Sequence, residues 1–97
     1  MQGILVPMTE LYAVVTGRVQ GVRYRDFIQV SATSLGIKGF VRNNRDGSVT
    51  VVGHGLPDEL KLFVEYLYEG SLASKVEAVS VEWRSVTVAY EDFAIVH

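Results

Sequence analysis

The fold of this chain is decided by the stretch from residue 11 to residue 25, Leu11-Tyr-Ala-Val-Val-Thr-Gly17-Arg-Val-Gln-Gly21-Val-Arg-Tyr-Arg25. Its first five residues are apolar, and this run, which ends at Gly17, predicts a β-strand over residues 11–17 near the centre of a sheet. A short loop with a second glycine follows, and a helical pattern begins beside Arg25. The stretch therefore predicts a strand, a tight loop and a helix in immediate succession.

The loop that contains Gly17 and Gly21 has the character of an anion-binding site. Glycine lets backbone N–H groups approach a ligand closely, and the first amides of a helix have no partner within the helix. These amides and the helix dipole favour an anion, to which Arg25 adds a planar, permanently charged group. A tight strand-to-helix turn would also explain both glycines. Arg25 favours the first interpretation, because a cation at a helix start opposes the dipole and has the wrong sign for stability alone.

Two amphipathic helices are predicted. The first covers residues 24–35, and Gly36 follows it where a left-handed C-cap belongs. The second begins at Pro57, which suits a first helical turn, and ends at Gly70. Apolar side chains gather on one face of each helix. They are Tyr24, Phe27, Ile28 and Leu35 in the first, and Leu60, Phe63, Val64 and Leu67 in the second.

The remaining strands follow from turn residues and alternation. Residues 39–43 and 48–53 are predicted strands, and Asn44-Arg-Asp-Gly47 between them predicts a hairpin. Apolar residues alternate with polar ones over residues 79–83, as in a half-buried strand. Val86 and Val88 either extend that strand or begin another, and residues 93–96 form a last short strand.

The predicted order is thus β-α-β-β-α-β with an extra short C-terminal strand. Two helices on one face of a mostly antiparallel sheet make a ferredoxin-like α+β fold. We expect one domain over residues 11–97, preceded by an N-terminal extension of residues 1–10. This fold serves RNA-binding modules, metallochaperones, regulatory domains and enzymes, so it does not decide the function.

Composition indicates a globular protein, with 48% hydrophobic and 21% charged residues and no cysteine. No segment has the length of a membrane helix or the pattern of a signal peptide, so we expect a cytoplasmic protein without a membrane partner. The formal net charge of −2 argues against a nucleic-acid binder. Six of the nine basic residues nevertheless lie between positions 18 and 45, where Asp26 is the only acid. Either these charges are scattered over the surface, or they make a local positive field for one anionic ligand.

Other kinds of site find little support in the sequence. The loop lacks the Gly-Lys-Ser/Thr ending of a P-loop and the G-x-G-x-x-G fingerprint. His54 and His97 are too few and too isolated for a metal site, and no Ser-His-Asp arrangement is evident. The strand over residues 48–53 has none of the aromatic residues that an RNA-binding module of this fold would need.

Asn43 is a second candidate site residue. It ends a predicted strand just before the hairpin turn, where asparagine is common for structural reasons. Its amide could also hold a water through its donor and acceptor groups together. Asn44 is the more natural turn residue of the two, which leaves Asn43 freer for such a role.

Two motifs resemble the signatures of the acylphosphatase family. The first is Val15-Thr-Gly-Arg-Val-Gln-Gly-Val-Arg-Tyr-Arg25, and the second is Gly39-Phe-Val-Arg-Asn43 followed by Gly47-Ser-Val49 and Gly55. The resemblance implies a small ferredoxin-like enzyme that hydrolyses carboxyl-phosphate anhydrides to carboxylate and inorganic phosphate. It further implies a monomer that needs no metal or cofactor.

The resemblance also implies roles for individual residues. Arg25 would bind the phosphate, and Asn43 would orient the water. The backbone amides of the loop would complete the site, which assigns substrate binding to Gln20, Gly21, Val22, Arg23 and Tyr24.

The sequence departs from the family pattern at three places, of which the first is the N-terminal extension before Leu11, to which the family pattern assigns no role. Tyr24 stands where the family usually has Phe or Met, so we expect a hydroxyl near the site. The segment at residues 70–73 lacks the paired prolines often seen after the second helix, which should affect the loop and not the chemistry.

Two further hypotheses come from the residues. The terminal carboxylate of His97 could pair with Arg25 in the empty site. The alternative function is a non-catalytic phosphate-binding or anion-binding ferredoxin-like module that acts through a partner.

Overall fold

The computed structural model describes residues 8–97; residues 1–7, most of the predicted N-terminal extension, lie outside the described residues. Five strands and two helices make up this part of the chain. In order they are β1 (Thr9–Arg18), α1 (Tyr24–Ser34), β2 (Lys38–Asn43), β3 (Val49–Gly55), α2 (Pro57–Glu69), β4 (Lys75–Ser85) and β5 (Phe93–Val96).

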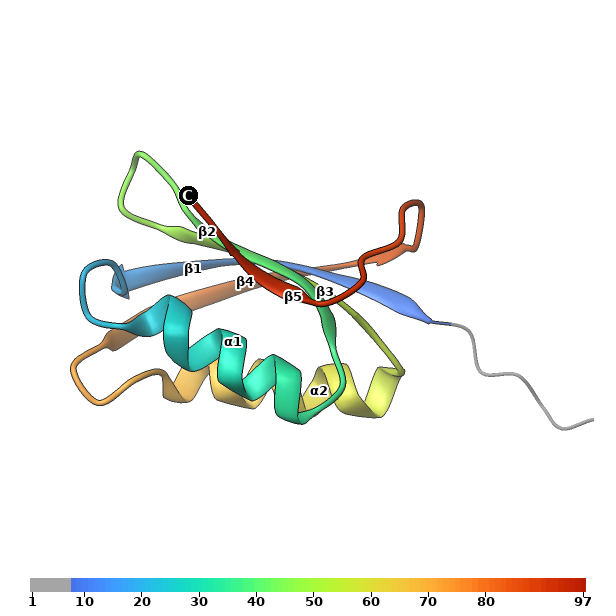
Figure 1. Cartoon of the computed structure of the whole chain (residues 1–97). Coiled ribbons are helices and arrows are strands. Elements are labelled where there is room, and N and C mark those ends of the chain that lie inside the picture. Colours follow the sequence, from blue (N-terminus) through green and yellow to red (C-terminus); the bar gives the residue numbers. More distant parts are fainter. Residues whose placement is uncertain (1–7) are drawn as a thin grey trace, which may run out of the picture.

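The strands form one sheet in the order β4-β1-β3-β2-β5, and both helices cover the same face of it (Figure 1). Every neighbouring pair is antiparallel except β2 and β5, which run parallel. The predicted ferredoxin-like α+β fold is confirmed, including the extra C-terminal strand, which adds to the sheet beside β2. The predicted position of β1 inside the sheet is also confirmed.

The core lies between the helices and the covered face of the sheet. Leu11, Ala13 and Val15 alternate along β1 with less buried residues and are fully buried, as expected for a strand with one face on the core. The apolar stripe of α2 packs onto them through Leu60, Phe63 and Leu67, which are also fully buried. Burial of each such side chain contributes about 1.5–3 kcal/mol, so the stripe holds α2 in place.

Two strands extend well beyond their predicted bounds. β4 begins at Lys75, four residues before the predicted start, and ends at Ser85. It pairs with β1 along the whole of that strand, from Arg18↔Lys75 to Thr9↔Ser85, so β1 sets its length. Val86 and Val88 belong to no strand and lie in the loop before β5. β1 in turn begins at Thr9, within the segment predicted as an extension.

The predicted hairpin joins β2 to β3, and its turn is held by its own side chains. The backbone N–H of Asn44 donates to the Ser48 carbonyl at 2.8 Å, and side chains add to this bond. The Asp46 carboxylate accepts hydrogen bonds from the Ser48 hydroxyl at 2.5 Å and the Ser48 amide at 3.0 Å. These two bonds, the side-chain one first, lower the pKa of Asp46. Hydrogen bonds therefore fix the conformation of the turn at the point where β2 ends.

Three connections and the end of the last strand gather at one end of the sheet (Figure 1). They are the loop after β1, the β2–β3 turn, the end of β5 and the loop between α2 and β4. Every residue that either sequence motif assigns to the site lies at this end.

Candidate active site

The loop of residues 19–23, here called the cradle loop, joins β1 to α1. The backbone amides of residues 20–26 find no hydrogen-bond acceptor within residues 8–97, and the first helical bond near them runs from the Phe27 amide to the Arg23 carbonyl. Unpaired amides at a helix start are donors available to an anion. The predicted anion-binding character of this loop thus has a structural basis.

The cradle loop has an unusual backbone. Gly21 has a φ of 71°, which suits glycine, and a Cβ there would meet nothing within 4 Å. Arg23, the residue before α1, has a φ of 63°, the only positive φ at a non-glycine position in the described residues. Such a conformation costs on the order of 1 kcal/mol and is found preferentially at functional sites.

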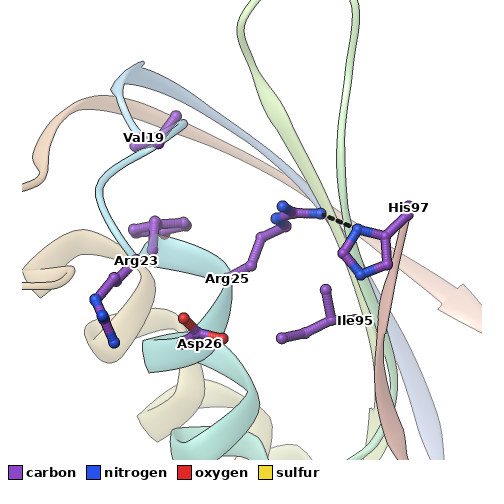
Figure 2. A pocket seen from close by; sticks show the side chains of 8 residues that line it. Val19, Arg23, Arg25, Asp26, Ile95 and His97 are labelled. Atoms are coloured by element: carbon purple, nitrogen blue, oxygen red, sulfur yellow. Dashed lines mark hydrogen bonds between the residues drawn. The ribbon is translucent and has the colours of Figure 1, made fainter.

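A pocket of about 500 Å³ lies between the cradle loop and the end of β5 (Figure 2). It is lined by Val19, Gly21, Arg23, Tyr24, Arg25, Asp26, Ile95 and His97. Arg23 and Arg25 make the pocket basic. The exposed Asp26 also lines it and adds one negative charge. Of the six basic residues between positions 18 and 45, only Arg23 and Arg25 line this pocket. Arg42, for example, lies over the Phe40 ring, 5.7 Å from its centroid.

The Arg25 guanidinium is only weakly engaged by the protein. Its Nη1 lies 3.4 Å from the Val96 carbonyl oxygen and 3.4 Å from Nδ1 of His97. Figure 2 shows the side chain reaching across the pocket toward His97, whereas Arg23 points the other way. No carboxylate within residues 8–97 pairs with Arg25. The hypothesis that the His97 carboxylate holds Arg25 is wrong, because the contact is made by the imidazole ring.

Asn43 ends β2 on the face that the helices cover, because it follows the buried Val41 by two residues. It comes directly after Arg42, which pairs with Val96 of β5, the residue whose carbonyl contacts Arg25. The Asn43 Oδ1 atom is buried and is the one buried side-chain polar atom in the described residues without a hydrogen-bond partner. Such an atom calls for a water or a ligand.

Asn44 serves the turn, as the sequence predicts. Its side-chain amide donates to the Ser48 hydroxyl at 2.9 Å and to the Thr50 hydroxyl at 2.8 Å. The prediction that Asn44 is the turn residue is therefore confirmed. The side chain of Asn43 makes none of the hydrogen bonds that hold the turn.

Gln20 has a role that the sequence does not predict. Its side-chain amide donates to the Asn44 carbonyl at 2.8 Å and to the Ser48 carbonyl at 2.9 Å. The side chain therefore ties the cradle loop to the hairpin that carries Asn43. No sequence signal indicates this contact, because its partners lie 24 and 28 residues away.

Tyr24 does not place a hydroxyl near the pocket, and that expectation is wrong. Its side chain is buried, and the hydroxyl donates to the Leu67 carbonyl of α2 at 2.7 Å. Burial raises the pKa of this phenol well above its ordinary value. The first turn of α1 faces α2, so the ring fills the space between the helices and only the backbone of Tyr24 belongs to the cradle.

Val22 is held from the opposite side. The Ser71 hydroxyl, in the loop between α2 and β4, donates to the Val22 carbonyl at 2.8 Å. The cradle loop is therefore fixed by Gln20 to the hairpin and by Val22 to the α2–β4 loop. This second contact also has no local signal in the sequence.

The described part of the chain offers neither a metal cluster nor a membrane helix. No three His, Cys, Asp or Glu side chains within residues 8–97 lie together as metal ligands could. Neither α1 nor α2 is long and apolar enough to span a bilayer.

Comparison with known proteins identifies the family. The family model described as Acylphosphatase matches residues 11–95. An acylphosphatase of Thermus thermophilus is 47% identical over 76 residues, which cover 78% of this chain and 86% of the relative. The crystal structure of acylphosphatase from Bacillus subtilis superposes with a TM-score of 0.89 at 36% identity, over 92% of this chain and 99% of that one.

A larger protein contains a similar unit. Full-length HypF, in its phosphate- and nucleotide-bound form, matches 99% of this chain with 13% of its own length, at a TM-score of 0.87 and 28% identity. The family model covers both sequence motifs, and the relative from Thermus thermophilus covers more than three quarters of this chain. The chain belongs to the acylphosphatase family.

Proposed function

We propose that this protein is an acylphosphatase, which hydrolyses acyl phosphates to a carboxylate and inorganic phosphate. One observation carries the proposal: unpaired amides, a weakly engaged arginine and an orphan buried asparagine oxygen lie at one end of the sheet. Relatives named Acylphosphatase support it.

Arg25 and the cradle amides bind the phosphoryl group in this proposal. A guanidinium can contact two phosphoryl oxygens at once, and Arg25 is free to do so because its protein contacts are long. The amides of Gln20, Gly21, Val22, Arg23 and Tyr24 donate to the remaining oxygens. Phosphoryl transfer depends chiefly on positioning and on stabilisation of charge, which these donors provide.

Asn43 orients the attacking water. Its Oδ1 accepts a hydrogen bond from the water, which turns a lone pair of the water oxygen toward phosphorus. The new bond forms between water oxygen and phosphorus, and the bond between phosphorus and the acyl oxygen breaks. The leaving group departs as a carboxylate, which is already stable as an anion, so it requires no protonation by the protein. The proton lost by the water ends on the phosphate product.

The proposal also covers the cellular compartment, the oligomeric state and the kind of substrate. We infer that the protein acts in the cytoplasm as a monomer, on small-molecule acyl phosphates and not on nucleic acids. The net charge of −2 supports the last point. The residues assigned to the site are an arginine, an asparagine and backbone amides, which perform their roles here without a metal or a cofactor.

A phosphate-binding module without turnover is the second candidate. The match to 13% of the phosphate- and nucleotide-bound HypF supports it, because a unit of this shape also exists within a larger protein. The same cradle would then bind phosphate or another anion on behalf of a partner.

Turnover separates the two candidates. We expect the purified protein to hydrolyse acetyl phosphate in the presence of a metal chelator, with inorganic phosphate as a competitive inhibitor. Release of phosphate is measured against the spontaneous rate. Absence of turnover, together with binding of inorganic phosphate, would favour the binding module over the enzyme.

A further inference from the structure

The imidazole ring of His97 lines the pocket between the cradle loop and β5, here called the basic pocket. Nδ1 of the ring lies 3.4 Å from Nη1 of Arg25, the residue proposed to hold the phosphoryl group. Figure 2 shows the ring at the tip of the Arg25 side chain and the Asp26 carboxylate away from it. An anion held by Arg25 therefore lies within reach of the ring, which has no role in the mechanism proposed above.

The contact with Arg25 favours one protonation state of the ring. A guanidinium has only donors, so Nδ1 is the acceptor in this contact. The neutral ring then carries its proton on Nε2, which makes no hydrogen bond to residues 8–97. An imidazolium ring has a proton on both nitrogens, so it loses the contact and lies beside a second positive charge. Without an anion in the pocket, Arg25 therefore favours the neutral ring.

A phosphoryl group in the basic pocket reverses this preference, because its negative oxygens accept hydrogen bonds from an imidazolium ring. The other charged and titratable groups come from the elements that pack against β5. At the pocket they are Arg23, Arg25, Asp26 and Tyr24, whose hydroxyl is turned to α2. The neighbouring strand β2 contributes Arg42. Three arginines outnumber one carboxylate, so a protonated ring gains most from a bound anion.

We propose that His97 is a further ligand of the phosphoryl group, and that the anion binds in the basic pocket together with a proton on the imidazole ring. This inference takes the identity of its natural ligand from the proposed function. Affinity for a dianion then rises as the pH falls, because the anion and the proton each strengthen the binding of the other. An opposite charge within about 4–6 Å changes the proton affinity of a group by roughly tenfold or more, and reciprocity gives anion affinity the same factor.

Inorganic sulfate tests the inference without relying on turnover. Sulfate is tetrahedral and stays a dianion from about pH 5.5 to about pH 8, the range in which histidine changes its charge, whereas phosphate itself titrates there. Titration calorimetry on the full chain gives Kd at both ends of this range, and a second buffer gives the number of protons taken up. We expect Kd to be about tenfold lower at the lower pH, with net proton uptake. A Kd that does not change with pH would overturn the inference.

His97→Asn assigns the pH dependence to the ring. The side-chain oxygen of asparagine is attached to Cγ, as Nδ1 is in histidine, so an acceptor for Arg25 remains but cannot be protonated. His97 is exposed, so the fold should tolerate the change. We expect the Kd values at the two pH values to agree within about twofold, without proton uptake. A pH dependence that persists in His97→Asn would contradict the inference.

Two further variants complete the test. His54→Gln is the matched control, because it removes the other histidine of the chain, which does not line the basic pocket. It should keep the native pH dependence, and loss of that dependence would assign the effect to His54 and overturn the inference. Arg25→Ala locates the bound sulfate, and its Kd should rise by about tenfold or more. An unchanged Kd would place the sulfate outside the basic pocket and would also overturn the inference.

Failure here is distinguishable from failure of the proposed function. Acetyl phosphate hydrolysis by the native protein reports on the enzyme alone. Turnover together with a pH-independent Kd for sulfate would remove the role of His97 and keep the enzyme. A pH-dependent Kd that His97→Asn abolishes, without turnover, would keep the proton-linked anion site and remove the catalysis.

Discussion

Polar groups on the open face of the sheet, which the helices do not cover, have hydrogen-bond partners within the protein. Several polar groups at the end of the sheet that carries the cradle loop have none among residues 8–97. On the open face, Glu10 of β1 lies opposite His54 of β3, and Nε2 of His54 is 2.8 Å from Oε1 of Glu10. Both residues are buried, with exposures of 8% and 4%. The Tyr90 ring, in the loop before β5, lies 4.9 Å from the imidazole. At the cradle end, by contrast, the amides of residues 20–26 and Oδ1 of Asn43 have no partner in the described residues.

This difference helps to distinguish polar groups that stabilise the fold from polar groups that are candidates for binding a ligand. A buried donor or acceptor left unpaired costs about 1–3 kcal/mol, so a fold keeps such groups only where something else satisfies them. In the Glu10–His54 pair, each side chain provides the other's hydrogen-bond partner, and the pair contributes to stability. At the cradle end, Oδ1 of Asn43 is a buried atom without such a partner in the described residues, and Arg23 of the nearby cradle loop has a positive φ.

Loss of the Arg25 guanidinium should have the largest effect. We expect Arg25→Ala to lower turnover of acetyl phosphate by roughly 10³-fold or more, because an arginine on the transferred phosphoryl group contributes at that scale. Arg84→Ala is the matched control: Arg84 lies on the open face with its guanidinium 4.0 Å from the centroid of the Tyr12 ring. Its turnover should equal that of the native protein. Retention of more than a tenth of the activity in Arg25→Ala would refute the assignment.

Asn43→Ala should have the second largest effect. We expect kcat to fall by about 10²–10³-fold, which is typical when one preorganised polar group is removed. Phosphate affinity should change little, because Asn43 holds the water and not the phosphoryl group. Steady-state kinetics and a phosphate titration measure the two quantities. A large loss of phosphate affinity at constant kcat would move Asn43 from the water to the ligand.

Gln20→Met tests the tether between the cradle loop and the hairpin. It removes the hydrogen bonds to the Asn44 and Ser48 carbonyls and keeps the length of the side chain. We expect kcat to fall about tenfold, since each bond contributes about 1 kcal/mol to holding the loop beside Asn43. Kinetics and thermal unfolding are measured together. A drop in Tm with native kinetics would show that the tether stabilises the fold and does not position the site.

The smallest effect on activity belongs to the open face. Glu10→Ala leaves His54 buried without its partner and should lower the free energy of unfolding by about 1–3 kcal/mol. Turnover should not change, because Glu10 lies on the face of the sheet opposite the helices and the cradle. Denaturant unfolding and kinetics measure both. An altered kcat would show that the two regions are coupled.

Local patterns in the sequence predict the features of the fold and site that depend on neighbouring residues. The strand-loop-helix around Gly17 and Gly21, the hairpin at residues 44–47 and the left-handed Gly36 after α1 each depend on residues a few positions apart. All three appear in the structure. Asn43 could be singled out because Asn44 is the better turn residue, again a local argument.

Contacts between distant segments could not be predicted in the same way. Three hydrogen bonds join residues that are 24 or more positions apart. They run from Gln20 to Asn44, from Ser71 to Val22 and from the Tyr24 hydroxyl to Leu67. The length of β4 likewise depends on its pairing with β1 and not on its own alternation. Position in the packed structure, and not residue type, decides these features.

The most direct test of the proposed mechanism follows the oxygen of the attacking water. Acetyl phosphate is hydrolysed by the protein in ¹⁸O-labelled water, and both products are analysed by mass spectrometry. Attack on a phosphoryl group held by Arg25, from a water held by Asn43, predicts that the label enters inorganic phosphate and not acetate. Label in the acetate would mean attack at the acyl carbon, and would contradict the assignment of the cradle to the phosphoryl group.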